Sequence, residues 1–159
     1  MTLEEGLLIL HIAAVFVLVG GIAITTATAV ATVGKRDVGA IAAAAGLMHR
    51  VETRVVVPGA LLAAAFGTWL VIEQGRSFGE SWLSLSYALW LVLTGLVTGV
   101  LGGHARVVAE RAQAAAQRGE RESAELAELF GDPKVRTVSL AVDVLLVVFL
   151  YLMVVKPGA

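Results

Sequence analysis

The fold is decided by residues 7–33, LLILHIAAVFVLVGGIAITTATAVATV, a run without a single Asp, Glu, Lys or Arg. Three further apolar runs follow it, at residues 55–73, 82–104 and 136–155. An α-helix rises about 1.5 Å per residue, so each run is long enough, or nearly so, to cross roughly 30 Å of hydrocarbon. These runs predict an all-α polytopic membrane protein with four transmembrane helices in an antiparallel bundle.

Composition supports a membrane protein and excludes several other classes. Hydrophobic residues make up 58% of the chain, more than in most soluble domains. Four spans and their connections use nearly all of the 159 residues, so residues 1–159 are predicted to form a single domain. The net charge of −1 gives no basic field for nucleic acid. The absence of cysteine excludes disulfides and thiolate metal sites, and no metal site is predicted.

The distribution of basic residues predicts the orientation in the membrane. Most of the 12 Lys and Arg residues lie in or beside the connections that follow the first and third spans. The opposite side carries only Arg76 and Lys156. Positively charged connections stay on the cytoplasmic side. The chain is therefore expected in the cytoplasmic (inner) membrane, with both termini outside and the two long connections in the cytoplasm.

The connections themselves contain helical sequence. Residues 105–130 are rich in Ala, Glu, Arg and Gln, which favour helix. An amphipathic cytoplasmic helix is predicted to continue the third span through these residues. It either docks a partner or is a solvated helix with intrahelical ion pairs. Pro58 predicts a distortion at the entry to the second span.

Small residues at four-residue spacing predict where helices pack closely. They are Gly21, Thr25 and Ala29 in the first span, Gly59, Ala63 and Gly67 in the second, and Gly95, Gly99 and Gly103 in the third. The first expectation is packing between helices of one chain. The alternatives are a homodimer seam, or space for a flat cofactor beside glycine.

Asp143 is the one charged side chain deep within an apolar run. It lies about eight residues, or ~12 Å, from the cytoplasmic start of the fourth span. A carboxylate at this depth normally faces the bundle interior or a water-filled pocket. It is a candidate proton relay, cation site or partner of a buried base. The alternative is a neutral acid bonded to Ser139 or to a threonine of another helix.

Three histidines are candidate ligands. His11 lies about one turn inside the outer end of the first span, on a small and weakly polar face that is predicted to point inward. A neutral imidazole there ligates haem iron, shuttles protons, or acts as a hydrogen-bonding strut. His49 and His104 are weaker candidates at the cytoplasmic ends of the second and third spans. A shared site would require their side chains to converge.

Several motifs together resemble one family. They are Leu10-His11-Ile12 with Gly20-Gly21, Gly67-Thr68-Trp69-Leu70 after Pro58, Trp82-Leu83-Ser84-Leu85, and the closing Met153-Val154-Val155-Lys156-Pro157. The chain resembles, over nearly its whole length, the bacterial integral membrane family known as domain of unknown function 2269. The resemblance implies four transmembrane helices and no particular activity.

The first helix is also similar to that of copper-resistance protein D and of HemJ-type protoporphyrinogen oxidases. In the latter a first-helix histidine is tied to haem, and His11 maps onto that position. The tryptophan that usually precedes the glycine is replaced by Val19, before Gly20. This resemblance implies a haem b site with His11 as an axial ligand.

The leading functional hypothesis is therefore a b-type haem-binding redox or haem-handling protein. The alternatives are a non-catalytic scaffold or accessory subunit, and a small transporter or proton pathway that uses Asp143. The lipid bilayer is the expected partner, and a homodimer or a partner subunit stays open. No catalytic residue is assigned, and enzymatic activity also stays open.

Overall fold

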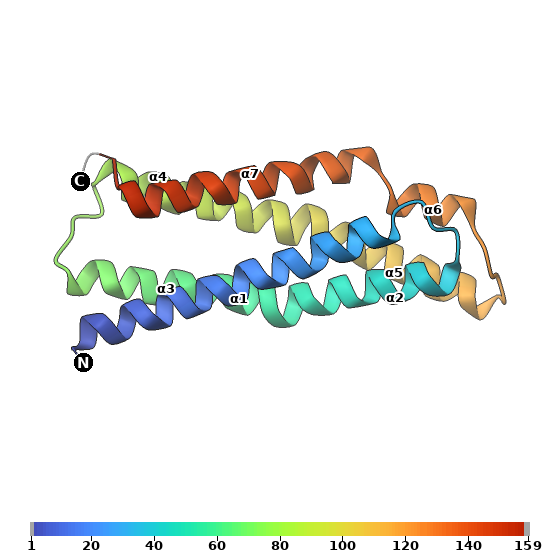
Figure 1. Ribbon diagram of the computed structural model, residues 1–159, viewed down its shortest axis with the longest axis horizontal. Coiled ribbons are helices and arrows are strands. Elements are labelled where there is room, and N and C mark those ends of the chain that lie inside the picture. Colours follow the sequence, from blue (N-terminus) through green and yellow to red (C-terminus); the bar gives the residue numbers. More distant parts are fainter. Residues whose placement is uncertain (1, 158–159) are drawn as a thin grey trace.

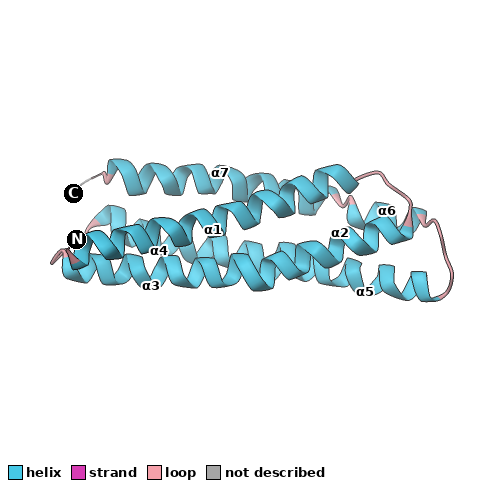
Figure 2. Ribbon diagram, turned by 60° about the horizontal axis from the view of Figure 1, so that its bottom comes forward, coloured by secondary structure: helices cyan, strands magenta, loops and turns pink. Residues whose placement is uncertain are grey.

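The computed structural model describes residues 2–157 and forms one elongated bundle of four helical rods (Figure 1). The first rod is α1 (Leu3–Thr32), and the second joins α2 (Val38–Val51), η1 (Glu52–Val56) and α3 (Val57–Glu73). The third rod joins α4 (Ser81–Thr94), η2 (Gly95–Gly102) and α5 (Gly103–Gln117), and the fourth contains α6 (Ala124–Phe130) and α7 (Pro133–Val155). The segments η1 and η2 are π-helical. Helices and loops make up the whole described chain (Figure 2), as predicted for an all-α protein.

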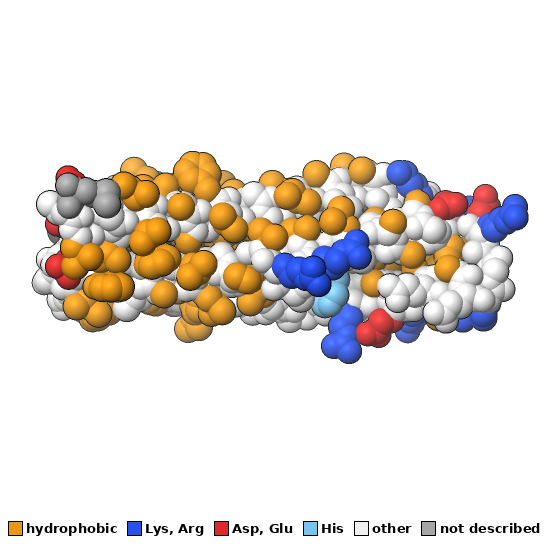
Figure 3. Space-filling model, turned by 90° about the horizontal axis from the view of Figure 1, so that it is seen from below, with side chains coloured by type: hydrophobic (Ala, Val, Ile, Leu, Met, Phe, Trp, Pro, Cys, Tyr) orange, Lys and Arg blue, Asp and Glu red, His pale blue; other side chains and the backbone are white. Residues whose placement is uncertain are grey.

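Each rod contains a segment long and apolar enough to cross a membrane. In the most apolar window of each rod, only between 11% and 28% of the residues are buried inside the protein. Hydrophobic side chains cover the bundle surface on the side of the chain termini, and charged side chains gather toward the opposite end (Figure 3). So much exposed apolar surface requires lipid around it. The predicted four-span membrane fold is confirmed.

We call the end opposite the termini the head, and define it by α2, α5 and α6. The helical stretch Ser81–Gln117 has 37 residues, which is about 55 Å of helix at ~1.5 Å per residue. This length exceeds the ~30 Å of hydrocarbon, so the head extends beyond the membrane. Its core is built mainly from small residues of α2 and α5 with one leucine of α6, namely Val38, Ile41, Ala45, Val108, Ala109, Ala112, Ala115 and Leu126.

The prediction of one continuous helix over residues 105–130 is wrong, because the helix is interrupted in the middle of this range. The helix α5 ends at Gln117, and Gly119 adopts a left-handed φ of 79°. The amides of Gly119 and Glu120 donate to the carbonyls of Ala116 and Ala115, which is a common glycine-terminated helix end. The chain then folds back, and Ser123 caps α6 by accepting a hydrogen bond from the Leu126 amide.

The distortion predicted at Pro58 takes the form of a π-helical turn. The amide of Val57 donates to the carbonyl of Glu52, five residues earlier. Because proline lacks an amide hydrogen, Pro58 cannot donate the next helical bond. The wider turn of η1 directly before it lets α2 continue into α3 as one rod.

Glycines allow α1 and α3 to approach closely at two levels. A Cβ atom on Gly59 would lie 3.1 Å from the backbone nitrogen of Leu18, and one on Gly67 would lie 2.9 Å from Cε1 of His11. In contrast, Cβ atoms on the three third-rod glycines, Gly95, Gly99 and Gly103, would meet nothing within 4 Å. The expected packing within one chain therefore does not hold for these three glycines.

The contact at Gly59 predicts a selective loss of stability. Replacing Gly59 with Leu should push α1 away from α3 and lower the free energy of unfolding by about 1–3 kcal/mol, the usual cost of overpacking. Thermal unfolding in detergent measures this change. The matched control is Gly95→Leu, which should change the melting temperature little. Equal losses in the two variants would contradict the close approach of α1 and α3.

Candidate functional site

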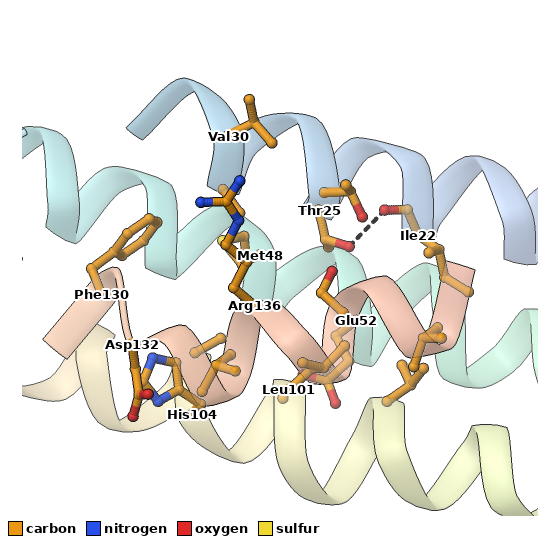
Figure 4. Close-up of a pocket in the computed structure, with 18 of the residues that line it drawn as sticks. Ile22, Thr25, Val30, Met48, Glu52, Leu101, His104, Phe130, Asp132 and Arg136 are labelled. Atoms are coloured by element: carbon orange, nitrogen blue, oxygen red, sulfur yellow. Dashed lines mark hydrogen bonds between the residues drawn. The ribbon is translucent and has the colours of Figure 1, made fainter. Parts of the chain in front are cut away.

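A cavity of about 280 Å³ lies where the two π-helical segments face α1 and α7. Most of its wall is apolar, including Ile22, Val56 and Val97. Polar and charged side chains reach it from all four rods, namely Thr25, Glu52, His104, Asp132, Arg136, Ser139 and Asp143. Figure 4 shows how the labelled members of this group enter the cavity from α1, η1, α5 and the start of α7. π-Helical turns are rare and often occur at functional sites.

Glu52 is the central acidic residue of the cavity, and it was not among the site residues predicted from the sequence. Only 8% of this residue is exposed. Its carboxyl lies against the backbone of Gly102, so closely that a Cβ on Gly102 would overlap it. The nearest basic side chain is His49, whose Nδ1 lies 4.0 Å from Oε2 of Glu52, too far for a hydrogen bond. Glu52 is thus a buried carboxyl that links η1 to η2.

A helical pattern in the second rod could have identified Glu52. Its position follows Ala45 by seven residues and precedes Val56 by four, and both of these residues are buried. That spacing places all three on one helix face. The neighbouring Arg50 and Arg54 instead placed this stretch among the basic residues in or beside the connection after the first span.

Asp143 also lines the cavity, from the opposite wall formed by α7. It is half-buried. Within residues 2–157 its carboxyl accepts no hydrogen bond and forms no ion pair. The alternative of a neutral acid bonded to Ser139 or a threonine therefore does not describe this structure. Besides the helix-capping carboxyl of Asp132, two carboxyls, from the second and fourth rods, face the same cavity.

The two histidines near the head have different surroundings. His104 lines the cavity, and its buried Nε2 has no hydrogen-bond partner among the described residues. His49 is not in the cavity wall, and its nearest ionic partner is Glu52. In the described part of the chain, no three His, Asp or Glu side chains come close enough to hold a metal ion. His104 thus shares the cavity with the carboxyls, whereas His49 contacts Glu52 from outside the cavity wall.

The remaining charged residues stand near the head side of the cavity. Asp132 accepts a hydrogen bond from the Lys134 amide at 2.8 Å and so caps α7. Arg136 is exposed and has no ion pair among residues 2–157. Its side chain extends toward α1, on the side of Val30 (Figure 4). Arg136 therefore leaves Glu52 with only its 4.0 Å contact to His49, and Asp143 with no basic partner among the described residues.

His11 lies in a separate place, between α1 and α3. Its Nδ1 is 2.8 Å from the carbonyl oxygen of Ala63. A carbonyl only accepts, so Nδ1 carries the proton and Nε2 of the neutral ring keeps its lone pair. The cavity begins on α1 at Ile22, 11 residues or about 16 Å farther along the helix. His104 thus cannot share a ligand with His11.

A cluster at the end near the termini explains two of the sequence motifs. The indole of Trp82 is buried and donates to Oε2 of Glu80 at 2.7 Å. This bond, with the nearby charge of Arg76, holds the pKa of Glu80 below its usual range. The guanidinium of Arg76 and the ammonium of Lys156 lie 5.7 and 5.5 Å from the Trp82 ring centre. Cation–π contacts of this kind fasten the end of α7 to α4.

Comparison with known proteins identifies the family. Residues 5–157 match the family model described as a predicted integral membrane protein, DUF2269. The chain belongs to the DUF2269 family. No curated protein and no solved structure matches it. The predicted family is thus confirmed, and its description assigns no activity, so a function has to be argued from the cavity.

The contact between Glu52 and Gly102 predicts an energetic coupling. Gly102→Ala should displace the carboxyl and reduce stability by about 1–3 kcal/mol. The same change in a Glu52→Ala background should cost much less, because the methyl group then has room. Unfolding of the four variants in detergent gives the coupling energy of this double-mutant cycle. Gly103→Ala is the control, since no atom lies within 4 Å of its Cβ position. A coupling energy near zero would contradict the contact.

Proposed function

We propose that this DUF2269 protein is a small transport protein that binds a proton or cation at Glu52 and Asp143. The observation that carries the proposal is that both carboxyls line one cavity and that, among residues 2–157, neither has a Lys or Arg partner. Their one ionic contact in that range is that of Glu52 with His49, at 4.0 Å. Removing a carboxylate from water is costly unless it gains a proton or a positive partner. Ionisable groups that face a cavity inside a membrane protein commonly belong to ion or proton pathways.

His104 and the position of the cavity support the same function. The unpartnered Nε2 of His104 is available to exchange a proton with a group in the cavity. The cavity extends along α1 from Ile22 to Val33, from the apolar part of the bundle toward the head. In this proposal the head lies in the cytoplasm, because the positive-inside rule favours that side for its arginines. The head-side end of the cavity then faces the cytoplasmic side of the membrane.

Proton flux into liposomes tests this proposal. Vesicles with the wild-type protein and a trapped pH-sensitive dye should dissipate an imposed pH gradient faster than empty vesicles. Asp143→Asn and Glu52→Gln should reduce the rate to nearly that of empty vesicles, because neither amide titrates. Glu110→Gln is the control, since Glu110 is exposed in the head and paired with Arg106. A wild-type rate equal to that of empty vesicles would overturn the proposal.

A haem b site at His11 is the second candidate. It is supported by the bond from Nδ1 to the Ala63 carbonyl, because a ligating histidine commonly donates its other ring nitrogen to such a group. The fit extends to one axial ligand, since the cavity that His104 lines begins, at Ile22, about 16 Å farther along α1. A haem bound there would supply one-electron redox chemistry. The bond to the Ala63 carbonyl would fix the orientation of the His11 imidazole, and Nε2 of that ring would then be the atom that ligates the iron.

The visible spectrum of the purified protein tests the haem candidate. Protein from haem-replete cells should show a Soret band that His11→Ala removes and His104→Ala retains. A colourless preparation that gains no band after haem addition would exclude this candidate. A protein with neither haem nor flux would favour the scaffold hypothesis, in which residues 105–130 dock a partner subunit.

A further inference from the structure

The cavity opens sideways, between α1 and α7. In the bundle α1 packs on the second rod, mainly on its α3 segment, whereas α7 packs on α4 and η2 of the third rod. Two residues of the cavity wall on this side are strongly exposed, Val30 at 70% and Leu140 at 59%. Both belong to apolar spans, so their exposed surface faces lipid. The opening therefore lies toward the bilayer, at the height of the cavity.

The size of the cavity favours an organic ligand over a bare ion. One water molecule occupies roughly 30 Å³ in the liquid, and a small inorganic cation needs a comparable space. The cavity measures about 280 Å³, close to the lower limit of ~300 Å³ for pockets that bind small molecules. A bare ion would leave most of the apolar wall without a contact. A ligand with apolar groups would cover it.

The charges of the cavity favour a cationic group at its inner end. Glu52 is buried against Gly102 at the back of the cavity, and Asp143 faces the cavity from α7. The one arginine of the wall, Arg136, extends toward α1. The wall at Val30 and Leu140 is apolar apart from the exposed Arg136 on the side of Val30, and the interior carries the two carboxyls. An anion would be repelled by these carboxyls, because like charges repel strongly where water is scarce.

We propose that the ligand of this cavity is an amphipathic organic cation, an ammonium or similar group that carries apolar substituents. It enters from the bilayer between α1 and α7 and brings its positive charge to Glu52 and Asp143. Its apolar part stays against the walls near Val30 and Leu140. This inference rests on the proposed function and names the class of substrate for the same site.

Binding of two ions of similar shape and opposite charge tests the ligand class. Tetraphenylphosphonium is a lipophilic cation, and tetraphenylborate is the corresponding anion. Calorimetric titration of the unmodified protein in a neutral detergent should show saturable binding of the phosphonium and none of the borate. Tetramethylammonium, which lacks a large apolar part, should bind much more weakly. Saturable binding of both tetraphenyl ions, or of neither, would overturn the inference.

Two sets of variants test the site and the route. Asp143→Asn and Glu52→Gln should each weaken phosphonium binding by about tenfold or more, as expected when one partner of a desolvated charge pair is lost. Leu140→Trp should obstruct the mouth and reduce binding. Val144→Trp is its control, because the exposed fraction of Val144, 63%, is close to the 59% of Leu140, but Val144 does not line the cavity. Wild-type affinity in both carboxyl variants, or in Leu140→Trp, would contradict the assignment.

The two proposals can fail separately. Proton flux that depends on Asp143, without phosphonium binding, would leave the proton pathway intact and overturn the organic-cation inference. Phosphonium binding that depends on both carboxyls, without any flux, would support the ligand class and overturn transport. Monodisperse elution of each variant in size-exclusion chromatography establishes that lost binding does not reflect misfolding.

Discussion

The packing of a carboxyl on a glycine backbone organises the centre of this protein. Glu52 enters from η1 and fills the space over Gly102 at the end of η2. A buried acid normally requires a basic partner, yet its nearest one is His49 at 4.0 Å. The second and third rods therefore meet around a buried carboxyl whose one ionic contact among the described residues is this histidine. The cavity, its second carboxyl and the proposed chemistry all depend on this contact.

The bundle consists of two unequal halves joined around the cavity. The first half contains α1, α2, η1 and α3, with close helix packing at Gly59. The second half contains the remaining helices and joins α7 to α4 through Trp82 and Lys156. Longer side chains, including Ile22 and Val142, fill the space between the halves within the membrane. Where they stop, between α1 and α7, the cavity opens.

The sequence allowed the membrane fold to be predicted, because lipid imposes a simple rule on long apolar runs. It also identified Asp143, since a lone carboxyl in such a run stands out. Glu52 escaped notice because its neighbours are charged, although its helical register matches buried residues. The end of α5 was missed because Gly119 lies among helix-forming residues, and only its left-handed φ shows the stop. The glycines of the third rod follow the packing pattern, but the pattern does not reveal which face meets a neighbour.

The alanine-lined pairing of α2 with α5 has a mechanical consequence. It is the main place where backbones of the two halves come close together. The connections beside it are also linked, because the Ser123 amide donates to the Arg36 carbonyl and the Val38 amide to the Arg121 carbonyl. The head is thus the place where the two halves are most closely held together. Any rotation of one half about this place would displace the end that carries Trp82 more than the cavity, because that end lies farther from the head.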